Sequence, residues 1–338
     1  MDVRQILKDL TIGAGVSGCE QEIVPIAEKY LKEYGDVHTD ALGNVILTID
    51  GEGDGVLLDA HMDMVGMIVT AITPEGFLRV DACGHIDTRQ LGAQQVTIHG
   101  KKNISGIVIS TPPHLRGNSE NNGMKMSDVL IDTGFSENEI KEIVSLGDRV
   151  TVNSEFTELL GDRVSCGALD DRAGMASLIC ALEYLREKGC KKKITISFST
   201  REEVGGSGAK TAAFNAEAKE LIAVDVSFAD TPDSNSEECG ELSKGPMIGV
   251  SSSLDYDMSQ RFIGTAKRCG IPYQLEIMGG RTGTDADGMT IARGGFISGL
   301  ISIPLRYMHT GVEVVSVSDV ENTGRLIAEY IAGGNENA

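Results

Sequence analysis

Four short apolar segments of this chain each lead into acidic residues or a histidine, and this pattern constrains the fold more than any other feature. The segments are Val56-Leu-Leu-Asp-Ala60 before His61, Ile194-Thr-Ile-Ser-Phe-Ser-Thr200 before Glu202 and Glu203, Leu221-Ile-Ala-Val224 before Asp225, and Phe296 to Ile303 before His309. Apolar runs of this length are typical of buried strands. The carboxyl ends of parallel strands form the edge at which open α/β sheets bind ligands. We therefore expect these side chains to converge at one edge of a sheet.

A fifth ligand-type residue, Asp170, precedes a helical pattern of apolar residues that ends at Gly189. Two imidazoles and three carboxylates then form a site suited to divalent zinc, cobalt or manganese. Taken singly, each feature also fits a simpler structural role. A glutamate pair after a strand is typical of a solvated turn, His61 of a buried core histidine and Asp225 of a turn carboxylate. Their joint occurrence favours a metal site.

The five residues can be divided between two metal ions. A pair of ions about 3.5 to 4 Å apart can share the work of hydrolysis, provided that one short ligand bridges them. Asp170 suits that role because its carboxylate has one oxygen for each ion. The remaining ligands then fall into two pairs, His61 with Asp225 and Glu203 with His309.

Two further carboxylates are expected to assist without holding metal. Glu202 is left free to act as general base and general acid. Asp63, two residues after His61, is placed to accept the second ring N–H of that histidine. The residues alone therefore predict a di-metal hydrolase.

The composition excludes several classes of partner and location. A formal charge of -20 argues against nucleic acids and anionic membranes as partners. No segment approaches the roughly 18 uninterrupted apolar residues of a membrane helix, and the first residues lack the apolar core of a secretion signal. The seven cysteines are scattered and never form a Cys-x-x-Cys pair. We expect reduced thiols and a cytoplasmic protein.

The order of predicted elements indicates one domain interrupted by another. Helices and strands alternate up to about residue 64 and again after residue 159. Between residues 65 and 158 short β-type segments and turns dominate, with one helix predicted near residues 136–145. We therefore expect an α/β domain formed by residues 1–64 and 159–338, and an inserted β-rich domain formed by residues 65–158.

The sequence resembles the tetrahedral aminopeptidases, a family of cytosolic di-metal exopeptidases also labelled glutamyl aminopeptidase or endoglucanase-M-like. The likeness runs nearly end to end. It is carried by Gly15-Val-Ser-Gly18 with Glu20, Asp40 with Gly43-Asn44, His61-x-Asp63, Pro112-Pro-His114, Ala168-Leu-Asp-Asp-Arg172, Glu202-Glu-Val-Gly205, Asp225, Gly283-Thr-Asp-Ala286 and Arg306-Tyr-Met-His309.

The resemblance implies an α/β/α zinc-peptidase-like domain with a central mixed sheet, and an inserted β-barrel-like dimerisation domain. It also implies removal of N-terminal residues from short peptides, and assembly of dimers into a hollow dodecamer. The family's roles match those assigned above to Asp170, His61, Asp225, Glu203, His309, Glu202 and Asp63. Three features depart from the family pattern: Met64, Gly84-His85-Ile86-Asp87 and Arg281-Thr282. They bear on the shape of the pocket and on substrate preference.

Three other functions compete with an aminopeptidase. A glucanase usually binds sugars on aromatic platforms, which a chain with no Trp and 4% aromatic residues lacks. A di-metal deacylase, or another amidohydrolase acting on a small molecule, fits the same ligands. A non-enzymatic assembly subunit would not need all five ligands together with Glu202.

Overall fold

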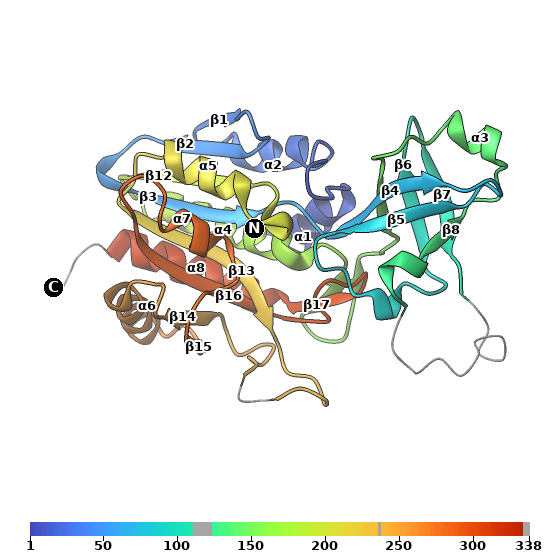
Figure 1. Cartoon of the computed structure of the whole chain (residues 1–338). Helices are drawn as coiled ribbons and strands as arrows, with labels where there is room; N and C mark the ends of the chain where they lie inside the picture. Colours follow the sequence, from blue (N-terminus) through green and yellow to red (C-terminus); the bar gives the residue numbers. More distant parts are fainter. Residues whose placement is uncertain (111–123, 236–237, 334–338) are drawn as a thin grey trace.

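The computed structural model describes residues 1–110, 124–235 and 238–333. They form a large sheet with helices on both faces, and a closed barrel that projects from one end of it (Figure 1). The predicted fold class, an α/β domain with a mixed sheet and an inserted barrel, is confirmed. Pro112-Pro-His114, one of the motifs of the family resemblance, lies outside the described residues.

The large sheet has eleven strands within the described residues. Their order is β1 (Asp36–Thr39), β2 (Val45–Ile49), β12 (Lys192–Ser199), β3 (Glu52–His61), β13 (Glu220–Phe228), β16 (Ile297–Arg306), β17 (Glu313–Ser316), β11 (Arg163–Cys166) and β10 (Thr157–Glu158), while β14 (Met247–Ser251) joins β16 to β15 (Gln274–Met278). The four central strands β12, β3, β13 and β16 run parallel, so their carboxyl ends share one edge.

Helices cover both faces of this sheet because its central strands are apolar on both sides. Leu58 and Ile222 belong to the main core, which includes α1 (Val3–Ile12), α4 (Leu169–Glu187), α6 (Tyr256–Cys269) and α8 (Val317–Gly333). Leu57 and Leu221, one residue earlier on the same strands, pack with α5 (Ser207–Asn215) and α7 (Asp285–Met289). The alternation along each strand therefore produces three layers.

Residues outside two helices help to set where they begin. Helix α2 (Val24–Leu31) follows a turn in which the Glu20 side chain accepts a hydrogen bond from the Gly18 N–H, and Pro25 occupies its first turn. Helix α8 begins at Val317, and Asp162 accepts the N–H of Val317 with its backbone carbonyl and the N–H of Ser318 with its side chain.

The inserted strands close into a barrel with its own apolar core. Their order is β4 (Gly66–Ile72), β5 (Leu78–Cys83), β8 (Leu130–Asp132), β7 (Asn103–Val108), β6 (Gln95–His99) and β9 (Arg149–Val152). Helix α3 (Glu137–Lys141) and the short 3-10 turns η1 (Thr88–Gln90) and η3 (Met126–Asp128) connect them. Closure pairs each of the six described barrel strands on both sides.

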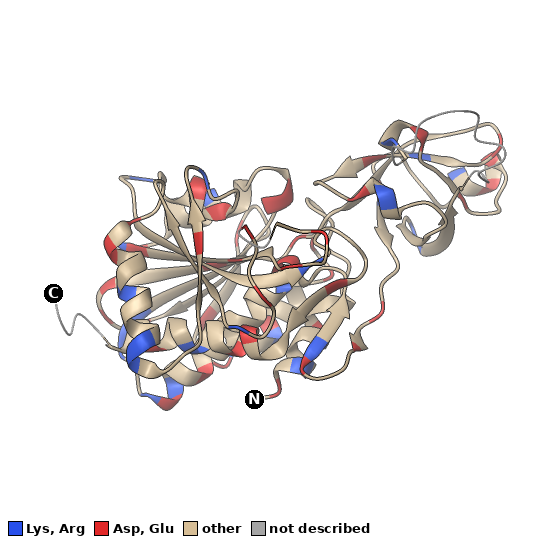
Figure 2. Cartoon of the chain, turned by 90° about the horizontal axis from the view of Figure 1, so that it is seen from below, with Lys and Arg blue, Asp and Glu red and all other residues tan. Residues whose placement is uncertain are grey.

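Charged residues occur on both the three-layer part and the barrel (Figure 2). Acidic residues outnumber basic ones, 50 against 30. Within the part of the chain that the structure describes, no helix is both long enough and apolar enough to cross a bilayer.

Candidate metal centre

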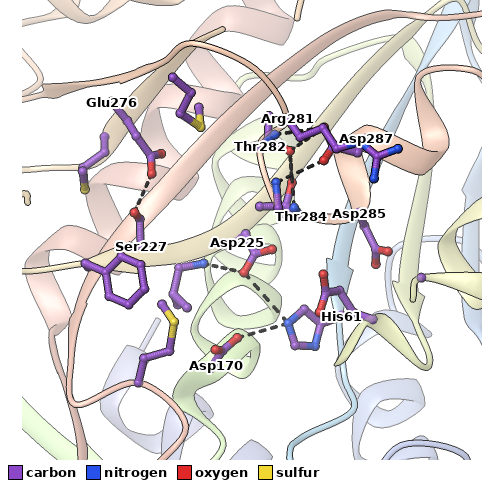
Figure 3. A pocket seen from close by; sticks show the side chains of 18 of the residues that line it. His61, Asp170, Asp225, Ser227, Glu276, Arg281, Thr282, Thr284, Asp285 and Asp287 are labelled. Carbon is purple, nitrogen blue, oxygen red and sulfur yellow. Dashed lines mark hydrogen bonds and ion pairs between the residues drawn. The ribbon is translucent and has the colours of Figure 1, made fainter. Parts of the chain in front are cut away.

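The edge formed by the carboxyl ends of the parallel strands brings the predicted residues together. His61 is the last residue of β3, and Asp225 lies on the neighbouring β13. The 3-10 turn η4 (Glu202–Val204) follows β12, and His309 lies three residues after β16 ends. Asp170 reaches the same edge from the first turn of α4. All five candidate ligands line one cavity of about 740 Å³. Figure 3 shows three of them, His61, Asp170 and Asp225.

Three of these residues form a first candidate metal group. The Nε2 atom of His61 lies 3.1 Å from Oδ1 of Asp170 and 3.9 Å from Oδ1 of Asp225. The potential ligand atoms of the group all lie within 4.8 Å of one another, and all three residues are buried. Such a spacing allows a single ion to contact all three side chains.

A second candidate group uses the other oxygen of Asp170. The Nε2 atom of His309 lies 3.3 Å from Oδ2 of Asp170 and 3.5 Å from Oε2 of Glu203. These ligand atoms also lie within 4.8 Å of one another. The two oxygens of Asp170 therefore face two different imidazoles, as a carboxylate shared between two ions would require.

Burial and repulsion between carboxylates dominate the electrostatics of the site. Burial raises the pKa of Glu203 well above its usual range, and the charge of Asp170 raises it further. Burial and the charge of Asp171 likewise raise the pKa of Asp225. For Asp170 burial acts in the same direction, but hydrogen bonds with His309 and His61 outweigh it and lower the pKa. Divalent cations would favour the ionised form of all these carboxylates.

An unpartnered buried oxygen also indicates that the five candidate ligands could hold divalent ions. Glu203 Oε1 is buried and has no hydrogen-bond partner among the residues that the structure describes, although most buried side-chain polar atoms have one. Two imidazoles and three carboxylates are also a donor set that zinc, cobalt and manganese accept. A bound cation would give this oxygen the partner that it lacks.

Asp63 connects His61 with the turn that carries the two glutamates. The Nδ1 atom of His61 lies 3.1 Å from the backbone carbonyl of Asp63 and 3.5 Å from its carboxylate. That carboxylate accepts the hydroxyl of Ser17 at 2.6 Å and the N–H groups of Glu202 at 2.9 Å and Glu203 at 3.3 Å. It therefore fixes the backbone of η4 as well as lying beside the imidazole.

Glu202 faces the cavity but belongs to neither candidate metal group. Its side chain is half-buried, and burial raises its pKa above the usual value, which His61 partly offsets. Gly205, which follows the turn, has a φ of +114°, a backbone conformation that residues other than glycine rarely adopt. The glycine thus lets the chain turn sharply after the acidic pair.

One important buried carboxylate, Glu313, was not among the predicted site residues. Its two oxygens accept the N–H of His309 at 2.8 Å and that of Asp170 at 3.2 Å. It therefore holds the backbone of two candidate ligands that lie on different elements. A local signal exists, because Glu313 opens the apolar strand β17 and a charged residue there is unusual.

The inserted segment also reaches the site, through the loop that follows β5. His85, one of the departures from the family pattern, lines the cavity, and its carbonyl lies 3.0 Å from Nδ1 of His309. A Cβ atom at Gly84 would lie 3.2 Å from Oε2 of Glu203, so this approach favours glycine. Gln90 Nε2 donates to the carbonyl of His309 at 3.2 Å. The inserted segment therefore helps to position His309.

A three-layer fold with imidazoles and carboxylates gathered at one sheet edge defines a class of metal-dependent hydrolases. Comparison with known proteins identifies the group within it. The chain belongs to the M42 glutamyl aminopeptidase family, which matches residues 43–326. It is 35% identical over 331 residues to the lysyl aminopeptidase of Pyrococcus furiosus, covering 95% of this chain and 94% of that protein.

Two solved structures show the same fold along the whole chain. The TET aminopeptidase of Thaumarchaeota archaeon SCGC AB-539-E09 has a TM-score of 0.93 at 31% identity and covers 99% of this chain and 97% of its own. The TET1 peptidase of Pyrococcus horikoshii, which can assemble into a tetrahedron or a large octahedral shell, has a TM-score of 0.84 at 31% identity, with 97% and 98% coverage. The protein is therefore a metal-dependent aminopeptidase, as predicted.

Proposed function

We propose that the enzyme removes N-terminal residues from short peptides with two divalent ions per chain, held by His61, Asp170, Asp225, Glu203 and His309. One observation carries this proposal: the two oxygens of Asp170 face the two imidazoles. Zinc or cobalt suits the donor set best, and manganese is also compatible. When bound, such a pair polarises a carbonyl and lowers the pKa of water.

The side chains around the ions then handle the protons. Glu202, which belongs to neither ligand group, accepts a proton from the attacking water and delivers it to the leaving amine. Burial raises the pKa of Glu202, whereas nearby dications would lower it, so the two effects oppose each other at this carboxylate. Asp63 acts as a positioning residue, because it accepts the backbone N–H groups of both glutamates in η4.

Removal and replacement of metal test this proposal. Chelation followed by dialysis should abolish hydrolysis of aminoacyl-p-nitroanilides, and zinc, cobalt or manganese added back should restore it. Metal analysis of the restored enzyme should approach two ions per chain. A preparation that contains no metal and retains full activity would contradict the proposal.

We further infer that the barrel is a dimerisation domain and that dimers assemble into a hollow dodecamer. The barrel projects from the three-layer part (Figure 1), and the similar Pyrococcus horikoshii peptidase assembles into closed shells. A hollow particle would admit short peptides and exclude folded proteins. The cytoplasm is the proposed location, because all seven cysteines are free thiols, as expected in a reducing compartment.

Light scattering on the intact protein tests the assembly. We expect a particle many times heavier than the 35.9 kDa chain, and twelve times heavier if the dodecamer forms. Tripeptides should be degraded and folded proteins spared. A monomer that digests both equally well would contradict the assembly and the size selection together.

A further inference from the structure

A further carboxylate, Glu276, enters the same cavity from the strand β15, beyond the candidate metal groups (Figure 3). Its Oε1 accepts a hydrogen bond from the hydroxyl of Ser227, and its Oε2 accepts one from the hydroxyl of Ser302 at 2.7 Å. Both carboxylate oxygens are therefore fixed. The side chain is half-buried and has a defined position in the cavity wall.

The sheet register places this carboxylate next to the metal centre. Ser302 on β16 is the direct partner of Asp225 on β13. Ser227 lies two residues after Asp225, so its side chain points to the same face of the sheet. Strand β13 continues to Phe228, past the end predicted at Asp225, which makes this second hydroxyl available. Glu276 is thus hydrogen-bonded to two serines that neighbour the candidate ligand Asp225, one across the sheet and one along the strand.

Within the described part of the chain, the side-chain partners of Glu276 are hydroxyl groups and not cations. Among the described residues, no Lys, Arg or His nitrogen forms an ion pair with it. The cavity cation Lys210 donates instead to the carbonyl of Gly205 at 2.8 Å. Arg281 lies apart from Glu276 in the view of Figure 3, on the side of Thr282 and Asp287. Among the described residues, Glu276 is therefore held by hydroxyl groups and not by a direct ion pair.

Four apolar side chains, three of them flexible methionines, line the same cavity. They are Phe228, Met247, Met278 and Met308. Methionine adapts its shape to a partner, and long basic side chains bury their methylene stems against apolar surfaces while their charged ends reach a polar group. A cavity that combines these apolar side chains with a fixed carboxylate matches the chemistry of lysine and arginine.

We propose that Glu276 determines substrate specificity by receiving the positively charged side chain of an N-terminal lysine or arginine. The inference rests on the proposed function, since it assumes that the substrate's first residue binds beside Asp225. An N-terminal glutamate would bring its own carboxylate against Glu276, and an aliphatic residue would leave the carboxylate unpaired.

The test measures kcat/KM of the metal-loaded enzyme for two substrates, lysine p-nitroanilide and norleucine p-nitroanilide. Norleucine has the same aliphatic stem as lysine but no charge. A charge-assisted hydrogen bond predicts a kcat/KM about 10- to 100-fold higher for lysine. In Glu276→Gln, kcat/KM for the lysine substrate should fall to that for the norleucine substrate. The kcat/KM for norleucine should change by less than about 3-fold. Glu276→Asp should restore part of the lysine preference. Glu241→Gln, an exposed change of equal charge on another segment, should preserve the preference.

Two results would overturn the specificity role. One is a wild-type enzyme that cleaves norleucine or glutamate substrates as fast as lysine substrates. The other is a Glu276→Gln variant that loses lysine and norleucine activity equally, which would indicate a structural role only.

Binding of free L-lysine and L-norleucine, measured by calorimetry, separates this inference from the proposed function. Tighter binding of lysine without cleavage of any substrate would contradict the proposed aminopeptidase chemistry and support the pocket. Equal binding of both amino acids would contradict the pocket itself.

Discussion

Substitution of Glu202 by glutamine is expected to lower kcat by about 10²- to 10⁴-fold, the usual contribution of general acid-base catalysis. Glutamine keeps the size of the side chain but cannot accept a proton. The backbone of the turn should stay in place, because its contact with Asp63 uses the N–H of residue 202 rather than its side chain. The measurement is kcat with a p-nitroanilide substrate, together with metal content.

The neighbouring Glu203 provides the control. It belongs to a candidate metal group, whereas Glu202 does not. Glu203→Gln should therefore reduce the metal content as well as the activity, and Glu202→Gln should leave the metal content unchanged. If Glu202→Gln empties the site and Glu203→Gln does not, the roles of the two glutamates are reversed.

Substitution of Asp170 by asparagine should weaken metal binding at both groups. An amide offers one oxygen where the carboxylate offers two, and those two oxygens face His61 and His309. Even residues that only support a metal ligand contribute 10- to 100-fold to affinity. We therefore expect a loss of about 100-fold or more, with hydrolysis close to background at limiting metal. Competition with a chelator of known affinity measures this loss.

Asp54→Asn is a suitable comparison, because it also removes a carboxylate but at an exposed position. It should leave metal affinity and activity unchanged. An Asp170→Asn protein that binds two ions as tightly as the wild type would exclude a bridging role for Asp170.

The site was predictable from sequence to the extent that its residues follow apolar strands. His61, Asp225 and the Glu202-Glu203 pair each follow a run whose composition identifies a buried strand. Parallel strands bring such positions to one edge whatever the details of packing. The prediction therefore needed the direction of the strands but not their order.

The supporting residues were harder to predict because they act across long sequence separations. Glu313 accepts the N–H of Asp170, a residue 143 positions away. Glu276 is fixed by Ser227, 49 positions earlier, on a part of β13 that the sequence did not reveal. Such contacts depend on the spatial order of β13, β14, β15 and β16, which no local pattern encodes. The same reason applies to the cap of α8, which Asp162 provides.

The most direct test of the di-metal centre is anomalous X-ray diffraction at the zinc edge from crystals of the zinc-loaded enzyme. Two peaks are expected in each chain. One should lie among His61, Asp170 and Asp225, and the other among Asp170, Glu203 and His309. A single peak, or peaks that do not share Asp170, would contradict a di-metal centre bridged by that carboxylate.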